Sequence, residues 1–300
     1  MTKRYVPLST CLLLLATWVM PATAQQPATA TAAKSSDKGF TRFIKRGRLG
    51  GEFQTAIATY EDDKGRKVDL IAAVHIADSS YYETLKKSFR TYDALLFELV
   101  APKGAAKTRH ERKSSSIISL IQRAMKSALD LEFQLDGIDY TQDNFVHADL
   151  TPSELRRKLH ERGQNMFTMF LDMMIDSMRA TRKNPEAQAP LGAILAALMS
   201  PNRAAQLKYI FAKQLDSIEE MMSGGKNSVL IHERNRRAME VLDEQLAAGK
   251  KNLGIFYGAA HMPDMERRLK ARGFHLVGKK WIVAWNIPDT ARKPRKLRKI

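Results

Sequence analysis

Apolar and polar positions divide the chain into a strand-rich beginning, a helical middle and a strand-rich end. Short apolar runs of strand-forming residues cover 53–60, 67–74 and 92–97, and another covers 253–257. Between them, from about 114 to 248, apolar residues recur at helical spacing. The pattern predicts an α/β protein, in which the two ends form a mixed sheet with parallel central strands and the middle is a large helical insertion over it.

Two stretches of the chain share one design: an apolar strand, small residues, a histidine and then a helix. In 253–273 small residues precede His261, Pro263 suits the first helical turn and Gly273 suits the helix end. Earlier in the chain, His75 takes the corresponding position. Because the carboxyl ends of parallel strands meet at one edge of a sheet, we expect both histidines at that edge, where α/β proteins hold ligands.

Turn and capping signals refine the expected elements. The segment 62–65 predicts a tight turn that joins the first two apolar runs into a hairpin. Thr151 is expected to begin a helix, with the spacing of a capping box. The segment 137–150 is predicted to be irregular, and 274–286 to be a terminal hairpin that turns at Gly278.

Glu98 is a third candidate for the sheet edge, because it ends the strand that follows His75. Two histidines and one carboxylate leave open positions for water and substrate, as in a catalytic metal site. Each histidine alone is typical of a hydrogen-bonded turn residue, whereas the matched pair with Glu98 favours a shared site. The pattern therefore predicts that His75, Glu98 and His261 hold a divalent metal ion such as manganese, cobalt or zinc.

Arg234 lies near the start of a predicted helix, 227–248. Its guanidinium could orient a substrate carboxylate or stabilise an oxyanion. The alternative is a solvated salt bridge to Glu233 or Glu240. Weaker candidates are His147, Asp149 and His232.

The segments that carry these candidates also resemble a known family. In chain order they read AAVHIAD, YDALLFE, HERNRRAME and LGIFYGAAHMPDMERRLKARGF. Together they are similar to the TraB/PrgY/GumN family, which is related to the Tiki metalloproteases. That family has two GxxH motifs, an acid that ends the strand after the first motif, and an arginine-bearing helix before the second. The resemblance covers the layout of 53–286, with sharp motifs at those four places only.

The resemblance implies a set of site residues and a metal-dependent activity. Residue by residue, the implied site is His75, Glu98, Arg234 and His261. Gly258 is the glycine of the second motif, but Ala72 stands where the first motif has glycine. Alanine forbids some backbone angles that glycine allows, so either the turn or the first half of the site differs from the family.

The beginning of the chain has the pattern of a signal peptide, predicted over 1–24. Lys3 and Arg4 precede a short apolar run, and the small residues 22–24 suit cleavage. We therefore expect export to the periplasm or the medium. Cys11 is the only cysteine, so a cleaved chain has none, and a metal site would depend on histidine and carboxylates.

Composition sets the expected boundaries and partners of the remaining chain. A flexible linker is predicted over 25–50 and the α/β domain over 51–290. The formal charge is +17, and six of the last ten residues, 291–300, are lysine or arginine. This basic tail is either simply solvated or in contact with an anionic membrane surface. Nucleic acid is not expected, because no binding motif is present.

Two functions fit these patterns. One is an exported metal-dependent hydrolase of peptide or amide bonds, in which metal-bound water attacks, Glu98 is a ligand or base, and Arg234 binds the developing negative charge. The alternative is a non-catalytic protein that binds a peptide or small-molecule ligand through the methionine-rich helix predicted over 164–178. A serine hydrolase is not supported, since no GxSxG motif occurs.

Overall fold

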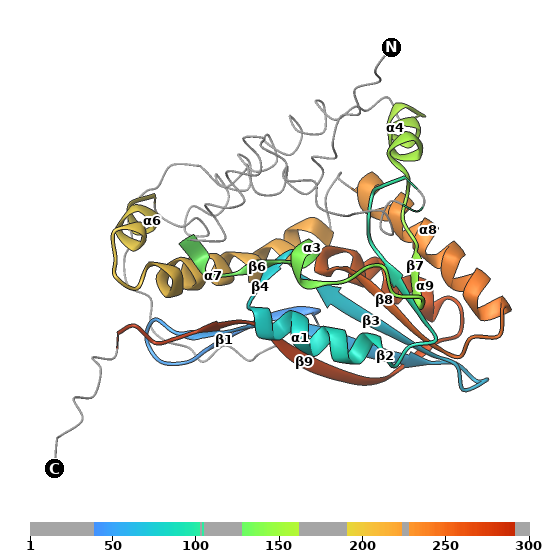
Figure 1. The fold of residues 1–300 in the computed structure, drawn as a ribbon, viewed down its shortest axis with the longest axis horizontal. Helices are drawn as coiled ribbons and strands as arrows, with labels where there is room; N and C mark the ends of the chain where they lie inside the picture. The colour runs from blue at the N-terminus through green and yellow to red at the C-terminus, as the bar shows by residue number, and fades with distance from the viewer. Residues whose placement is uncertain (1–38, 103, 105–127, 162–190, 224–227, 292–300) are drawn as a thin grey trace.

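The computed structural model contains the α/β architecture that the sequence pattern predicts (Figure 1). It describes residues 39–102, 104, 128–161, 191–223 and 228–291. Several predicted segments lie outside these residues: the signal peptide, most of the linker, the start of the helical region up to 127, the methionine-rich helix and nearly all of the basic tail.

The main sheet of the described residues has seven strands, in the order β1-β2-β3-β8-β5-β7, with β9 beside β2. The strands are β1 (Thr41–Lys45), β2 (Gly51–Glu61), β3 (Lys67–Ala73), β5 (Ala94–Phe97), β7 (Phe145–His147), β8 (Asn252–Gly258) and β9 (His275–Ile287). Strands β3, β8, β5 and β7 are parallel to one another, whereas β2 pairs antiparallel with β1, β3 and β9. The predicted mixed sheet with parallel central strands is confirmed.

The turn between β2 and β3 confirms the predicted hairpin. The Asp62 carboxylate accepts hydrogen bonds from the backbone N–H groups of Lys64 and Arg66, at 3.0 and 2.9 Å. Gly65 has a φ of 70°, a left-handed conformation that glycine adopts without steric cost. Short-range sequence signals were sufficient here because the hydrogen bonds that close the turn join residues close in the chain.

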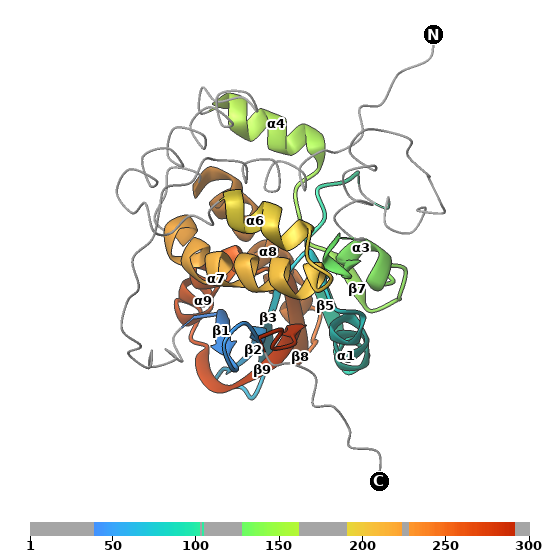
Figure 2. The ribbon, with the colours of Figure 1, turned by 90° about the vertical axis from the view of Figure 1, so that its left-hand side faces the viewer.

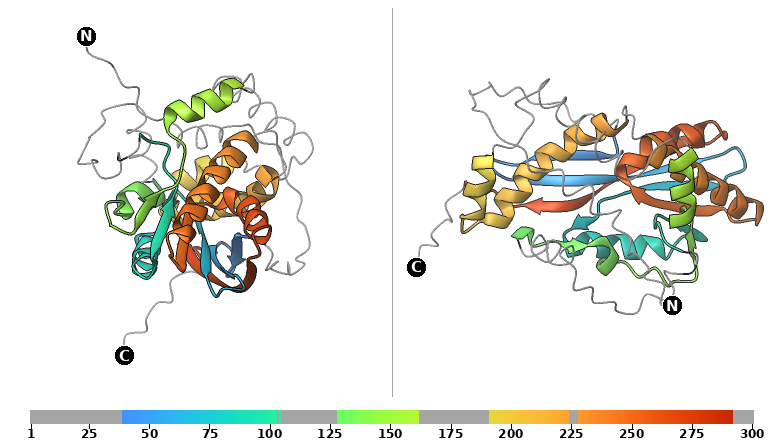
Figure 3. Two further views of the ribbon diagram at one scale, coloured as in Figure 1. Left: turned by 90° about the vertical axis from the view of Figure 1, so that its right-hand side faces the viewer. Right: turned by 90° about the horizontal axis from the view of Figure 1, so that it is seen from above.

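Helices pack on both faces of the sheet (Figures 2 and 3). On one face, α1 (Ser79–Phe89) and α7 (Arg203–Ser223) contribute to a core that includes Phe256. On the other face, α8 (Ser228–Ala247) and α9 (Met262–Lys270) lie side by side over Ile255. Burial on both faces explains why the parallel strands are continuously apolar in sequence.

The region predicted as a helical insertion, 114–248, is not wholly helical. Its described part includes α3 (Gln134–Gly137), α4 (Pro152–Glu161), α6 (Leu191–Leu198), α7 and α8. It also holds β6 (Glu132–Phe133), which pairs with β4 (Ile76–Ala77), and β7, which joins the main sheet beside β5. The prediction that 137–150 is irregular was therefore wrong at β7. A three-residue strand is too short to show an alternating pattern.

The predicted helix start at Thr151 is confirmed. The backbone N–H of Thr151 donates to the Glu154 carboxylate at 2.8 Å, and the N–H of Glu154 donates to the Thr151 hydroxyl at 3.3 Å. These reciprocal bonds form the capping box.

No helix among the described residues is long and apolar enough to cross a membrane.

Two boundaries predicted near the chain ends were wrong. The linker predicted over 25–50 ends earlier, because Phe40 is buried and β1 already pairs with β2. The hairpin predicted over 274–286 is a single strand, β9, which pairs along the whole of β2. Gly278 pairs with Thr59 next to a register shift, so this glycine marks a bulge in the strand and not a turn.

Candidate functional site

The predicted site residues meet at the carboxyl edge of the parallel strands. His75 follows β3, Glu98 follows β5, and His261 follows β8, which lies between those two strands. The expectation that these three residues share one edge of one sheet is confirmed. Pro263 occupies the first turn of α9, as predicted, so β8 leads through a short 3-10 turn (Ala259–His261) directly into that helix.

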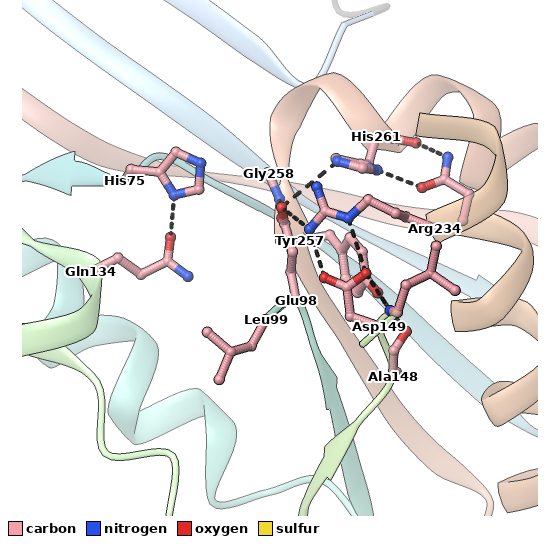
Figure 4. A network of polar contacts seen from close by, with 12 residues as sticks. His75, Glu98, Leu99, Gln134, Ala148, Asp149, Arg234, Tyr257, Gly258 and His261 are labelled. Carbon is pink, nitrogen blue, oxygen red and sulfur yellow. Dashed lines mark hydrogen bonds and ion pairs between the residues drawn. The ribbon is translucent and has the colours of Figure 1, made fainter. Parts of the chain in front are cut away.

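Arg234 of α8 reaches this edge and binds two carboxylates. Its Nη2 donates to Glu98 Oε1 at 2.6 Å and to Asp149 Oδ2 at 2.6 Å, and its Nε donates to Asp149 Oδ1 at 2.9 Å (Figure 4). The Asp149 side chain is fully buried, whereas those of Arg234 and Glu98 are each 12% exposed. The network is thus a nearly buried ion triad that solvent still reaches at Arg234 and Glu98.

The salt bridges considered for Arg234 on its own helix are not formed. Arg236 takes both of those partners, since it binds Glu233 and Glu240. Because Arg234 Nε and Nη2 are held by Glu98 and Asp149, only Nη1 remains for another ligand. Among the described residues Nη1 has no hydrogen-bonding partner, and in Figure 4 it lies beside the His261 ring.

Glu98 is fixed through both of its oxygens. Oε1 accepts from Arg234, and Oε2 accepts from the backbone N–H of Gly258 at 2.7 Å. A Cβ atom at position 258 would lie 3.4 Å from Glu98 Oε2, at the near limit of ordinary van der Waals contact. The second motif therefore has a glycine where the chain passes close to the carboxylate.

Electrostatics keep Glu98 ionised. Burial on its own would raise the pKa of the Glu98 carboxyl. The Arg234 charge, the two neighbouring histidines and the Gly258 N–H together outweigh burial and hold that pKa well below its usual range. Burial lowers the pKa of His261 to about 4, against the attraction of Glu98. At neutral pH the edge therefore presents a carboxylate, a guanidinium and a neutral imidazole.

His261 is held by its own set of contacts. Its Nδ1 lies 2.6 Å from the side-chain oxygen of Asn235, and its ring packs edge-on against Tyr257 at a centroid distance of 5.3 Å. The other ring nitrogen, Nε2, lies 3.8 Å from Glu98 Oε1. That distance is too long for a direct hydrogen bond but is spanned by one bridging donor.

His75 stands on the other side of Glu98 from His261 in Figure 4. Its Nδ1 lies 3.2 Å from the side-chain oxygen of Gln134, whose amide nitrogen donates to the Tyr140 hydroxyl at 2.9 Å. The Gln134 backbone N–H also donates to the His75 carbonyl at 2.8 Å. His75 is therefore turned toward α3, and only its Nε2 is left for a ligand.

Ala72, the departure from the first family motif, does not disturb the turn. It is buried in β3 opposite Tyr257, and its carbonyl accepts from the Tyr81 hydroxyl at 3.0 Å. Its φ is not positive, so the backbone there is one that alanine adopts without strain. The backbone that leads to His75 therefore needs no glycine.

The expected metal set does not assemble in the described part of the chain, where no three His, Cys, Asp or Glu side chains lie close enough together to hold an ion. The reason is that these residues already form hydrogen bonds with other groups. Arg234 and Gly258 occupy the two oxygens of Glu98, and His75 faces Gln134. As placed, His75, Glu98 and His261 do not fit a three-ligand metal site.

Sequence reasoning missed Asn235 and gave Asp149 too little weight. Asp149 was only a weak candidate, and its position became evident through β7, the strand that the pattern missed. Asn235 carries no motif signal in the sequence. The other weak candidates lie elsewhere: His147 binds the Leu99 carbonyl at 2.6 Å, and His232 lies 3.3 Å from Asp264.

Comparisons with known proteins found no match: no family model, no curated protein and no solved structure matches this chain.

Proposed function

We propose that the protein is a hydrolase of peptide or amide bonds that acts at the carboxyl edge of its sheet. The observation that carries the proposal is the joint placement of Glu98, Arg234 and His261, each nearly buried and each with an atom directed to the same point. The resemblance to the TraB/PrgY/GumN family supports the same residues.

Arg234 is suited to bind the carbonyl oxygen of the substrate. Its other donors are held by Glu98 and Asp149, so the guanidinium is already oriented before a substrate arrives. Nη1 can then donate to the oxygen as it becomes an oxyanion. Donors fixed in this way contribute strongly to catalysis, because no reorganisation is needed during the reaction.

His261 and Glu98 are suited to hold the attacking water. A water that donates to His261 Nε2 and Glu98 Oε1, at about 2.8 Å from each, fits between two acceptors 3.8 Å apart. In this mechanism the water oxygen attacks the carbonyl carbon while one water proton passes to His261 Nε2. The same proton then goes to the leaving nitrogen as the C–N bond breaks, which returns His261 to its neutral form.

The metal-dependent form of the prediction is not carried into this mechanism. The residues proposed as ligands have other partners, so no step is derived through an ion. An activity that needs no added metal is the expected result.

The alternative function, binding of a peptide or small-molecule ligand without turnover, is favoured by one observation. The low pKa of the buried His261, about 4, makes its imidazole a weak base at neutral pH. The same hydrogen-bonding groups would then hold a ligand without cleaving it.

We also propose export and a membrane partner on the strength of the sequence alone. The signal-peptide pattern of 1–24 supports a mature chain that begins near Gln25 in the periplasm or the medium. The basic tail supports contact with an anionic membrane surface.

The test uses the mature chain and a mixed peptide library, assayed with a chelator and again with manganese, cobalt or zinc. Cleavage that survives the chelator and is lost in His261→Gln supports the hydrolase. This activity should persist to about pH 4 and fall below it, as Nε2 takes up a proton. Cleavage only with added metal would overturn the mechanism, and ligand binding without cleavage would establish the alternative.

A further inference from the structure

A chain of buried hydrogen bonds lies behind His261 and leads away from the candidate site. Asn235 of α8 is fully buried, and Asp264 of α9 is nearly so. The Asn235 side-chain nitrogen donates to Asp264 Oδ2 at 2.8 Å and to the His261 carbonyl at 3.2 Å. Its side-chain oxygen lies 2.6 Å from His261 Nδ1.

These partners fix the orientation of the Asn235 amide. The Asp264 carboxylate and the His261 carbonyl can only accept hydrogen bonds, so the amide nitrogen must face them. The amide oxygen therefore faces His261 Nδ1, and a short contact with an acceptor requires a proton on that nitrogen. The remaining nitrogen, Nε2, then carries the lone pair and faces the candidate site.

Asp264 is itself held as an acceptor. Arg268 donates to Asp264 Oδ2 at 2.6 Å, and Arg267 binds Oδ1. Burial would raise the pKa of Asp264, but its bonds to Asn235 and Arg268 hold that pKa below the ordinary value. An ionised carboxylate in this place cannot donate a proton that would allow Asn235 to turn over.

We propose that Asp264 and Asn235 are positioning residues that hold His261 in the tautomer with its proton on Nδ1, so that Nε2 is the acceptor at the candidate site. Only the catalytic consequence of this inference rests on the proposed function. The tautomer of His261 does not depend on that function and can be measured by itself. A purely structural role, in which Asp264 simply joins α9 to α8, makes no demand on that tautomer.

The experiment measures the tautomer directly, by nitrogen and carbon NMR of the mature chain with isotope-labelled histidine. The full chain has seven histidines, and a His261→Gln variant assigns the signal of interest. We expect Nδ1 protonated and Nε2 bare in the unaltered protein. Asn235→Leu removes the acceptor. Asp264→Ala removes the shorter of the two bonds that orient the Asn235 amide nitrogen and leaves only the 3.2 Å bond to the His261 carbonyl. Both variants should therefore shift His261 toward the other tautomer.

Two further variants separate this role from simple packing. Asp264→Asn keeps an oxygen that can accept from Asn235, so it should retain the Nδ1–H tautomer. Asp243→Ala removes a different link, between α8 and the residues just after α9, in which the Asp243 carboxylate accepts from Arg272 at 2.9 and 3.0 Å. It should leave the His261 signals unchanged.

If Asn235→Leu does not fold, the His261 signals of Asp264→Ala and Asp264→Asn are sufficient to test the proposal. A proton on Nε2 in the unaltered protein overturns the proposal. So do unchanged signals in Asp264→Ala, or an equal shift in Asp243→Ala.

In a cleavage assay, Asn235→Leu should lower kcat by on the order of 10²-fold with little change in KM, the scale of acid–base catalysis. If no substrate is cleaved, the proposed function fails while the NMR result still decides the tautomer.

Discussion

Arg234 balances two negative charges in a place that water hardly reaches. Its guanidinium spans Glu98 and Asp149, which lie just after two neighbouring parallel strands, β5 and β7. Bringing two carboxylates this close is favourable only while a cation lies between them. The arginine therefore stabilises the fold at the same point where the proposed chemistry uses its free nitrogen.

Replacing Arg234 by glutamine should destabilise the protein strongly. The change leaves Glu98 and Asp149 buried without a counter-charge, and breaking a buried ion pair in this way costs about 3–5 kcal/mol. Denaturant unfolding measures the loss. The control is Arg236→Gln, which removes partly exposed salt bridges to Glu233 and Glu240, typically worth about 1 kcal/mol or less. Equal stability of the two variants would contradict the role given to Arg234.

His261 should make the stability of the fold depend on pH. Its pKa falls from 6.5 to about 4 on burial, so between these values the unfolded chain binds a proton that the folded chain does not. Stability therefore rises with pH through this window and is lost as pH falls from about 6.5 to 4, by on the order of 3 kcal/mol. Unfolding curves at pH 7, 6, 5 and 4 test this.

The matched control for that pH dependence is His261→Gln, which cannot take up the proton. Its stability should change less between pH 6.5 and 4 than that of the unaltered protein, because only the other titrating groups remain. Parallel curves for the two proteins would show that His261 does not titrate as its burial requires.

At the scale of elements, the unit of β8, the short turn and α9 carries the site. One glycine ends β8 and another follows α9, for different reasons. Gly258 has an ordinary φ of −52° but lies against Glu98, whereas Gly273 has a φ of 84° and nothing within 4 Å of the place where a Cβ would be. Gly258 leaves room for the Glu98 carboxylate, and Gly273 provides a left-handed end to the helix.

The two glycines should therefore give opposite results when changed to alanine. Gly258→Ala should lower activity while stability changes little, because its Cβ would touch Glu98 Oε2 at 3.4 Å without backbone strain. Gly273→Ala should keep activity and lose about 1 kcal/mol of stability, the cost of a left-handed alanine. Thermal unfolding and a cleavage assay on both variants check this. Loss of activity in Gly273→Ala alone would refute the assignment.

The sequence predicted those elements whose signals are local. The strand, small residues and histidine leading into α9, and the capping box at Thr151, depend on neighbours in the chain, and both are present in the structure. The pairing of β7 and the unbroken length of β9 depend on distant partner strands, so no short pattern could reveal them. Asp149 was undervalued for the same reason, because β7 brings it to Arg234.

At the scale of the whole molecule, the sheet joins the two ends of the described chain. Strand β3 pairs with β8, and β2 pairs along its whole length with β9, the last strand. His75 and His261 share an edge only because of these long-range pairings. The basic tail follows β9 in sequence, so it can be removed beyond residue 291 without deleting any residue of the paired strands.

A chain that ends at residue 291 should lose its affinity for anionic membranes. The deletion removes six lysine and arginine residues from a protein of formal charge +17. Each such residue contributes about 1 kcal/mol near an anionic lipid surface, so binding to phosphatidylglycerol vesicles should weaken by well over tenfold.

The control is a full-length variant with those six residues changed to glutamine. Its vesicle binding should weaken equally, because charge and not length sets the attraction. Vesicle sedimentation measures it, and added salt should abolish binding of the intact chain. Undiminished binding after truncation would mean that the tail is simply solvated.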